Sequence, residues 1–364
     1  MQIINHTRAV ADCSIGYATD GQAHLILAVK ATYEYTPTGE VIFAEQQIAL
    51  FDSDQFVGDP ATTSHEFEND FALRKARCDI LLTGHAYAPQ GRPAPLVGVG
   101  LRVGERMKVF NVTGTRHWQA GLLTITPGKP QPFTKQRIGY EVAFGGVDLS
   151  GKTIESYDLN PCGRGYFKHL KHSNIDGKPM PQTEALTSPI TSPTGKYIPQ
   201  SLGPIARNAM PRAGYAGTYD AAWIDERMPV LPEDFDERYY QAAPADQQID
   251  ALRSSEEIVM VNLSCQAEIR FKLPDLALNV QLQPKKGNAE THAARADTLI
   301  LEPDHNRFSV VWRVTRPIRQ SLQEWEHAIV GNASASRSAK ESVISLDVMR
   351  EGLRQLASHK TPRS

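Results

Sequence analysis

Apolar and polar residues alternate with a period of two over most of the first 144 residues. Successive side chains of a β-strand point to opposite faces of a sheet, so this alternation predicts strands with one buried face. Glycine and proline separate nearly all of the alternating segments, as is typical of short strands joined by turns. The predicted strands cover residues 24–35, 41–50, 78–87, 95–103, 105–113, 121–126 and 138–144.

Two intervals in this first part are predicted to connect strands. Residues 37–40 contain proline and glycine and are expected to form a turn, whereas residues 58–71 are expected to form a loop with at most one helical turn. Many short strands with hardly a helical period among them are typical of an antiparallel sandwich or a curled, barrel-like sheet. The predicted fold class is therefore mainly β.

The strand pattern returns after residue 250. The hairpin around Val29 and a second hairpin around Val311 are candidates for two halves of one sheet system, although the pattern does not establish that they pair. Residues 303–306 carry the polar composition of a hairpin turn. The predicted strands of this part cover residues 257–264, 266–272, 276–283, 297–302 and 307–315.

A short C-terminal helix is predicted directly after these strands. Residues 321–324 have the spacing of a capping box, in which the first and last side chains cap the helix start. Leu322, Trp325 and Ile329 then fall on one helical face before Gly331. We expect this helix to close the domain.

These elements are expected to form one composite β-rich domain over residues 1–331, with a tail at 332–364. The domain divides into an N-terminal sheet half (1–144), an irregular, loop-rich centre (145–250) and a C-terminal sheet half with the helix (251–331). The centre is rich in proline and glycine but also carries aromatic rings, which disordered tracts lack. We therefore expect an ordered loop insertion laid over the sheet.

The tail begins with a Ser/Ala-rich linker. Apolar residues then recur at three- or four-residue steps from Val343 to Leu356, which predicts an amphipathic helix with a capping start at Ser338. Such a stripe most often packs onto its own domain, and binding of a partner is the alternative.

Residues 219–247 form the most distinctive stretch of the chain. Aromatic and acidic residues are dense there, and three prolines cut the stretch into short pieces, which excludes a long helix. Rings bury a large apolar area where they can. We therefore expect a rigid, irregular structural plug, with Trp223 in the core rather than at an interface.

Together with residues 160–166, this stretch resembles the hallmark of the domain-of-unknown-function family numbered 2169. The resemblance extends from the N-terminus to about Val330. The matching positions are residues 160–166, 220–223, Arg227, 231–232, 234–236 and 243–247.

The resemblance implies a role in bacterial type VI secretion. It suggests a non-enzymatic adaptor or chaperone that binds a toxic effector, or a PAAR-like tip protein, and helps to load it onto the spike. The valine-glycine-repeat spike trimer is a further possible partner. The resemblance assigns no catalytic residue.

The composition argues against several classes of protein. Of 364 residues 41% are hydrophobic, and the formal net charge is -2, so no basic excess points to nucleic acid or to an anionic membrane. No run approaches the length needed to span a bilayer, and the N-terminus does not resemble a signal peptide, so a cytoplasmic location is expected. The four cysteines are scattered, which favours free thiols over disulfides or a zinc site.

Three patterns could carry ligand chemistry, and each has a simpler structural interpretation. The glycines from Gly98 to Gly104 lack the helix that a dinucleotide loop requires, so they are expected to mark a bend or bulge. His169 and His172, with Cys162 and Asp176 nearby in sequence, match no dedicated zinc pattern. The pair of residues 52 and 54, both aspartates, is expected to form a turn. We predict neither a cofactor nor a metal ion, and no Gly-x-Ser-x-Gly elbow is present.

The candidate partner-binding residues come from residues 160–166 and from the 219–247 stretch, because Arg and large aromatic side chains are common interface anchors. They are Arg164, Tyr166, Trp223, Arg227, Phe235, Tyr239 and Tyr240. The acidic residues between positions 225 and 237 either form internal ion pairs with Arg227 and Arg238 or present an acidic face to a basic partner.

Two other functions stay open at the level of sequence. One is a β-rich hydrolase or carbohydrate-active enzyme that uses Asp234 or Asp236 with a second carboxylate. The other is a structural subunit of the secretion machine, which would bind the spike in fixed stoichiometry.

Overall fold

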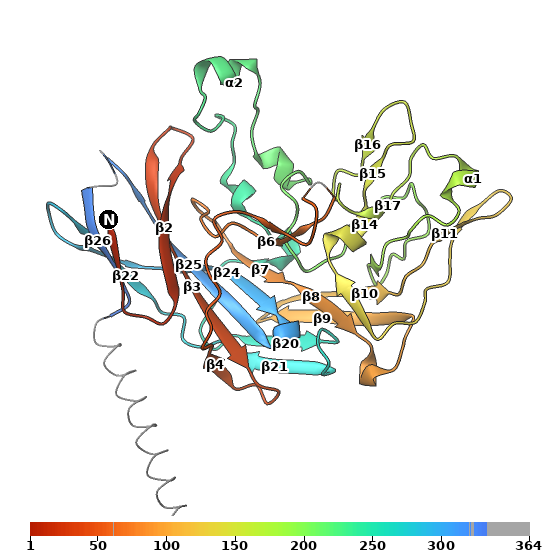
Figure 1. Cartoon of the computed structure of the whole chain (residues 1–364), viewed down its shortest axis with the longest axis horizontal. Coiled ribbons are helices and arrows are strands. Elements are labelled where there is room, and N and C mark those ends of the chain that lie inside the picture. The colour runs from red at the N-terminus through yellow and green to blue at the C-terminus, as the bar shows by residue number, and fades with distance from the viewer. Residues whose placement is uncertain (61, 320, 322–323, 333–364) are drawn as a thin grey trace, which may run out of the picture.

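A computed structural model describes residues 1–364 except for 61, 320, 322–323 and 333–364. Its largest sheet has seven strands and contains both hairpins singled out in the sequence (Figure 1). In order across the sheet these strands are β19 (Gln248–Ile249), β7 (Cys78–Leu82), β24 (Arg295–Glu302), β25 (Arg307–Pro317), β3 (Ala23–Tyr35) and β2 (Val10–Tyr17), with β4 (Val41–Phe43) also paired to β3.

The centre of this sheet is the antiparallel pair of β3 and β25. Val29 lies opposite Trp312 and Lys30 opposite Val311, so the two hairpins do belong to one sheet. Strand β3 is buried on both faces over most of its length, which explains its nearly continuous apolar sequence. Strands β24 and β7 pair in parallel, whereas the other pairs in this sheet are antiparallel.

A five-stranded antiparallel sheet packs against the first. Its strands are β18 (Thr183–Glu184), β10 (Arg106–Thr113), β9 (Leu96–Val103), β20 (Glu257–Val261) and β21 (Glu268–Lys272). Stacked rings join the two sheets, since Phe271 of β21 lies 4.6 Å from Tyr35 and 5.1 Å from Phe308, measured between ring centroids. One core cluster includes residues of both sheets, so they form stacked layers rather than a closed barrel.

The third sheet corrects the prediction of a closing helix. Its four strands are β1 (Gln2–Asn5), β26 (Trp325–Val330), β22 (Asn279–Pro284) and β23 (Glu290–Ala293). The prediction of a helix after residue 321 is wrong, because Trp325, Ala328 and Val330 are buried within β26. Strand β26 pairs in parallel with β1 and antiparallel with β22. These distant strands supply the backbone hydrogen bonds, and tertiary pairing therefore overrides the local helical spacing.

Short two-stranded ladders and loops complete the chain. The ladders pair β5 (Gln55–Phe56) with β6 (His65–Phe67), β8 (Gly84–Tyr87) with β13 (Lys135–Ile138), β11 (Trp118–Ala120) with β12 (Ile125–Pro127), β14 (Phe144–Gly145) with β17 (Arg164–Gly165) and β15 (Val147–Asp148) with β16 (Glu155–Ser156). Trp118 and Phe144 centre a second, smaller core cluster. The loop insertion is therefore an ordered lobe beside the sheets (Figure 1).

Among the strand predictions that are wrong in extent, three lose their ladder to other hydrogen bonds. Strand β4 stops at Phe43, after which the Gln47 amide bonds to the backbone N–H and C=O of Thr32. Residues 121–124 form the turn of the β11–β12 hairpin rather than a strand. Residues 138–144 are interrupted where the Asn160 amide donates to the carbonyls of Tyr140 and Phe144. The predicted loop at 58–71 contains one short strand, β6.

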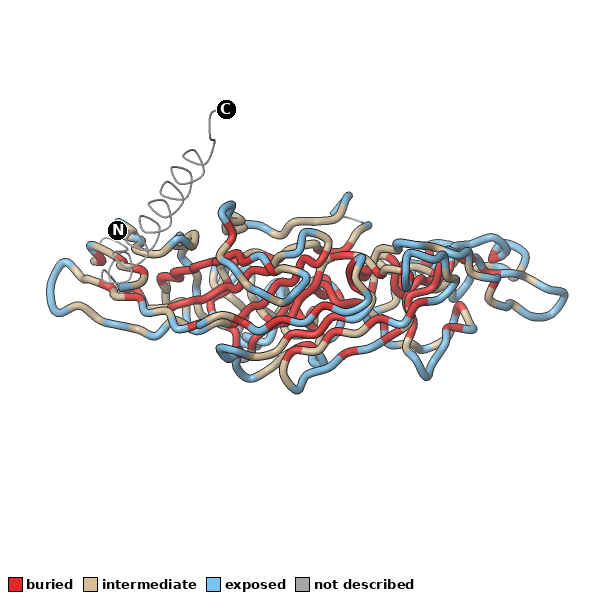
Figure 2. Tube along the Cα trace, turned by 90° about the horizontal axis from the view of Figure 1, so that it is seen from below, coloured by how far each residue is buried: buried red, intermediate tan, exposed pale blue. Residues whose placement is uncertain are grey.

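Helices are few and short in the described part of the chain. They are α1 (His172–Ile175), α2 (Ala221–Glu226) and the 3-10 turns Pro89–Gly91, Tyr140–Val142, Arg212–Tyr215, Glu237–Tyr240, Ala245–Gln247 and Pro303–His305. None of the described helices has the length and apolar character to cross a lipid bilayer. Seen edge-on, buried residues concentrate in the central layers, and exposed residues dominate the loops at both ends (Figure 2). The predicted tail helix lies outside the described residues.

Candidate functional site

The segment 219–247 divides into two parts with opposite surroundings. We call residues 217–234, which include α2, the arm, and residues 235–248 the clamp. The arm projects beyond the sheets, whereas the clamp lies along β7 and runs into β19, the edge strand of the seven-stranded sheet (Figure 1). The site is built from the clamp outward.

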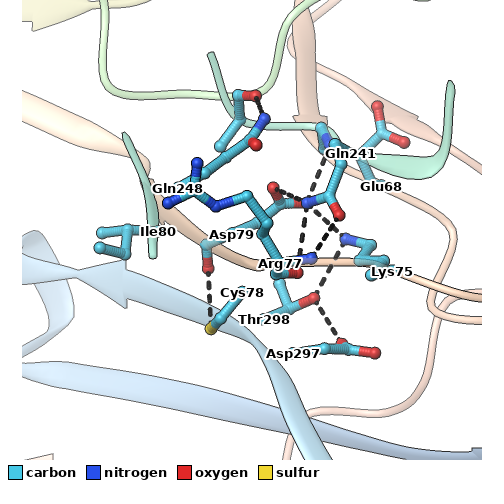
Figure 3. A network of polar contacts seen from close by, with 12 residues as sticks. Glu68, Lys75, Arg77, Cys78, Asp79, Ile80, Gln241, Gln248, Asp297 and Thr298 are labelled. Atoms are coloured by element: carbon cyan, nitrogen blue, oxygen red, sulfur yellow. Dashed lines mark hydrogen bonds and ion pairs between the residues drawn. The ribbon is translucent and has the colours of Figure 1, made fainter. Parts of the chain in front are cut away.

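Asp79 of β7 fastens the clamp to the seven-stranded sheet. This side chain is fully buried and accepts hydrogen bonds from Gln241 Nε2 at 2.7 Å and from the backbone N–H of Ala242 at 2.8 Å. Lys75 Nζ lies 2.7 Å from the same carboxylate and also donates to Thr298 of β24 (Figure 3). A buried charge is stable only when paired and hydrogen-bonded, and Asp79 meets both conditions.

Gln247 makes a second buried attachment. Its amide nitrogen donates to the carbonyls of Ile80 and Leu202, at 2.9 Å each, and its amide oxygen accepts from Lys108 Nζ at 2.8 Å. The next residue, Gln248, begins β19 and pairs with Asp79. The part of the family motif near residue 247 therefore attaches the irregular centre to the sheet.

A buried ionic cluster lies beneath the base of the arm. The Arg212 guanidinium donates two hydrogen bonds to Glu68, at 2.7 and 2.8 Å, and Arg207 donates to both carboxylate oxygens of Asp54. Burial alone would raise the pKa of Glu68, but the Arg212 and Arg207 guanidiniums and hydrogen bonding from Arg212 and His65 together outweigh burial and hold this pKa well below its usual value. The cluster links the loop around β5 and β6 to the segment before the arm.

This cluster also has the donor set of a metal site. Ligand atoms of Asp54, His65 and Glu68 lie within 4.8 Å of one another. Both carboxylates, however, already pair with the guanidiniums of Arg207 and Arg212. A cation placed between them would meet two positive charges, so we interpret the cluster as a structural ion-pair network.

Three of the predicted partner-binding residues form a half-buried aromatic layer over this cluster. The rings of Phe235, Tyr239 and Tyr240 contact one another edge to face, with centroids 5.4 to 6.4 Å apart. Tyr239 also lies over the guanidiniums of Arg207 and Arg212, at 5.6 and 5.5 Å. Burial raises the pKa of Tyr240 to about 12, which keeps its hydroxyl protonated. This layer joins the clamp to the segment around Arg207 and Arg212 that precedes the arm.

Trp223 occupies the arm and not the core. No residue of α2 is buried, so the prediction that Trp223 is a core plug is wrong. The ring is instead braced within the arm, because its indole N–H donates to the Val230 carbonyl at 2.8 Å and Tyr219 packs against it edge to face at 4.7 Å. The Asp220 carboxylate caps α2 by accepting from the backbone N–H of Trp223.

The two ends of the arm are joined at its base. The Asp234 carboxylate accepts from the backbone N–H and the hydroxyl of Thr218, at 2.9 and 2.7 Å. Gly217 has a φ of +82°, and a Cβ at this position would lie 2.8 Å from the Cβ of Pro232. Only glycine fits this close turn without a shift of its neighbours.

Arg227 ties the arm to the rest of the molecule. Its guanidinium donates to the Thr19 carbonyl at 2.6 Å, in the turn between β2 and β3, and pairs with Glu233 at 2.7 Å. The arm is thus fixed on one side by a long-range bond, although most of its other contacts are internal.

The arm presents apolar and acidic side chains to solvent. Tyr219, Ile224 and Met228 are 52%, 54% and 59% exposed. Five carboxylates against one arginine give the arm a strong negative charge: Asp220, Asp225, Glu226, Glu233 and Asp234 against Arg227. The arm thus combines exposed apolar side chains with a concentration of carboxylates.

Arg164 and Tyr166 lie elsewhere, in the loop lobe (Figure 1). Arg164 donates to the Glu141 carbonyl, and the ring of Tyr166 packs 5.2 Å from that of Tyr157. The seven predicted residues therefore do not form one surface.

The other sequence candidates take part in separate local contacts. Cys162 donates to Asn160, and burial raises its thiol pKa to about 12, whereas His169 lies 3.3 Å from Glu155. The Asp176 carboxylate accepts a hydrogen bond from the backbone N–H of Ala120. The glycine-rich stretch belongs to β9, and β10 follows it directly, without the helix that a dinucleotide loop needs.

The sequence reasoning missed the charged residues that hold the site together. Asp79 stands in the otherwise apolar strand β7. Charged residues are almost never fully buried unless paired. A lone charged residue inside an apolar strand therefore indicates a buried ion pair or hydrogen-bond network. It does not indicate which residue is the partner.

The geometry defines a β-rich protein with a stabilised, exposed arm. The chain belongs to the bacterial family DUF2169, described as "Uncharacterized protein conserved in bacteria", whose model matches residues 20–313. The resemblance found in the sequence is thus confirmed for the family. Neither the curated proteins nor the solved structures include a match to this chain.

Proposed function

We propose that this protein is a non-enzymatic adaptor that binds a type VI secretion effector, or a PAAR-like tip protein, and promotes its loading onto the spike. Binding is assigned to the arm, and the cytoplasm is the expected place of assembly. The family resemblance suggests the secretion system, and the structure of the arm supports the role in binding.

The observation that carries the proposal is an exposed element that is nevertheless held in one conformation. Trp223 is hydrogen-bonded within the arm, and Arg227 bonds to the backbone of a distant turn. A preorganised surface loses less conformational entropy on association than a flexible loop does. Family-motif residues in the arm thus maintain a shape that the core does not require.

The exposed side chains indicate the chemistry of the partner. Ile224 and Met228 need an apolar groove, and the surrounding carboxylates favour basic residues at its rim. Complementary charge of this kind mainly accelerates encounter and excludes wrong partners. We therefore expect an effector or tip surface that combines an apolar groove with lysine or arginine.

The enzymatic alternative gains no support from its two candidate carboxylates. Hydrogen bonds from Thr218 lower the pKa of Asp234, and the Arg238 guanidinium lowers the pKa of Asp236. A general acid in glycoside hydrolysis needs a raised pKa, which neither group has. The structural-subunit alternative differs from the adaptor in predicting a fixed ratio to the spike.

The proposal is tested by affinity purification of the tagged protein from its native cell, followed by mass spectrometry. Wild type is compared with the double variant Ile224→Asp, Met228→Asp. We expect an effector or tip protein with the wild type and at least a hundredfold weaker binding with the variant, because two interface anchors commonly contribute about 3 kcal/mol or more together.

The matched control is Leu122→Asp, Leu123→Asp, at the tip of the β11–β12 hairpin. These leucines are 100% and 92% exposed, so the control adds two charges on a different lobe. Both variants should unfold at the wild-type temperature. Equal binding by wild type and the arm variant would reject the arm, and recovery of the protein alone, even at low salt, would reject the adaptor.

A further inference from the structure

A cleft of about 520 Å³ lies at one end of the four-stranded sheet, remote in sequence from the arm. Its walls come from the turn between β22 and β23, the end of β25 and the start of β26. This volume falls within the range of about 300 to 1,000 Å³ that is typical of small-molecule sites.

The cleft carries a surplus of positive charge. Lys285, Lys286, Arg316 and Arg319 line it, together with two acidic residues, Glu290 and Glu324. Glu290 accepts from Arg316 at 2.5 Å, and Glu324 accepts from the backbone N–H of Arg319 at 2.9 Å. Within the part of the chain that the structure describes, no ion pair involves the side chains of Lys285, Lys286 or Arg319.

A buried donor in the same wall lacks an acceptor. Trp325 is only 6% exposed, and its indole N–H has no hydrogen-bond partner among the described residues. The other tryptophans all donate to carbonyls: Trp118 to Gly165, Trp223 to Val230 and Trp312 to Leu276. Arg316 Nε is likewise buried without an acceptor. Buried polar groups are normally satisfied, so two such donors beside one cleft require an explanation.

We propose that this cleft is a binding site for an organic oxyanion, that is, a ligand that carries a carboxylate or phosphate group on a larger body. The unpartnered groups of Trp325, Arg316, Lys285, Lys286 and Arg319 are all donors, and none of them can accept a hydrogen bond. Their ligand must therefore supply acceptors, and charged acceptors make the strongest such bonds. The site is independent of the arm and of the adaptor proposal.

The indole N–H groups provide a direct test by ¹⁵N–¹H correlation NMR of the intact protein. The sequence has four tryptophans, and Trp325→Phe identifies the Trp325 signal without removing a hydrogen bond. The probes are inorganic phosphate, citrate, and an acidic hexapeptide with either a free or an amidated C-terminus. We expect at least one probe to move the Trp325 signal downfield at millimolar concentration or below, with the other three signals unchanged.

The variant Lys285→Ala, Lys286→Ala should weaken this binding at least tenfold. Its matched control, Lys171→Ala, Lys196→Ala, removes the same charge from exposed lysines outside the cleft. Citrate or phosphate binding would identify a small-molecule site, whereas a preference for the free peptide terminus would identify a site for a chain end. The proposal is overturned if no probe moves the Trp325 signal, or if both lysine pairs change the affinity equally.

Discussion

The arm and the clamp are neighbours in one motif-bearing segment, with similar composition and opposite roles. Both contain aromatic rings, carboxylates and proline. The clamp contains Gln241, Ala242 and Gln247, which are buried against the seven-stranded sheet. In the arm, by contrast, no residue of α2 is buried. Composition alone therefore does not decide whether such a segment supports the fold or faces a partner.

The clamp and the arm differ in where their hydrogen-bond partners lie in the sequence. The clamp bonds to Asp79 and to the carbonyls of Ile80 and Leu202, all far away in sequence. The arm's contacts, by comparison, are mainly internal, and Arg227 provides its bond to the β2–β3 turn. Changes in the clamp should therefore affect folding, and changes in the arm should affect binding.

The largest expected effect is that of Asp79→Ala on stability. The change leaves the Lys75 ammonium, Gln241 and the Ala242 N–H without their buried acceptor. Breaking a buried ion pair on one side costs about 3–5 kcal/mol, so the free energy of unfolding measured in urea should fall by that amount. The control Asp225→Ala removes an exposed carboxylate of the arm and should change stability by less than about 0.5 kcal/mol. Similar losses in both variants would contradict the division into arm and clamp.

The pH dependence of stability should separate the buried ionic cluster, which lies under the clamp's aromatic layer, from the arm. The folded-state pKa of Glu68 is depressed well below its usual 4.5, so its stabilising contribution is complete above 4.5 and is lost as the pH falls toward the depressed value. We expect wild-type stability to decline as the pH falls below 4.5. Glu68→Gln should be less stable at neutral pH and should show a flatter decline.

Asp234, a carboxylate of the arm, provides the comparison with Glu68 in the pH dependence of stability. Hydrogen bonds from Thr218 also lower its pKa, but it is exposed. Asp234→Asn should therefore follow the wild-type profile closely in the same urea titration. If it flattened the decline as much as Glu68→Gln does, the arm would contribute to global stability after all.

The sequence predicts the parts of the fold that local periodicity determines. Strands β3, β9, β10 and β25 and the turn after β24 follow directly from alternating or nearly continuous apolar runs and from turn composition. Strand β26 does not, because the spacing of Trp325 and Ile329 fits a helix, and only pairing with β1 and β22 selects the strand. Sheet pairing joins residues far apart in sequence, and local pattern does not contain that information.

The candidate site shows the same limit at the level of single side chains. Aromatic density at Trp223 and Phe235 singled out the segment, but burial of Trp223 was expected because large rings usually lie in a core. In the structure the indole N–H of Trp223 instead donates to the Val230 carbonyl, and the ring of Tyr219 packs against Trp223 within the same arm. The supporting charges of Arg212 and Glu68 are 144 positions apart, and nothing in the sequence pairs them.

The smallest expected effect on the fold is that of Arg227→Ala, which removes the arm's bond to Thr19 and its pair with Glu233. The free energy of unfolding should change by less than about 1 kcal/mol, because the arm can open locally while the core stays folded. Limited proteolysis should nevertheless cut the arm several-fold faster, and partner binding should weaken because preorganisation is lost. Arg238→Ala is the matched control, since Arg238 is an exposed arginine of the clamp that pairs with Asp236. A large loss of global stability in Arg227→Ala, with unchanged cleavage of the arm, would instead make the arm an integral part of the folded core.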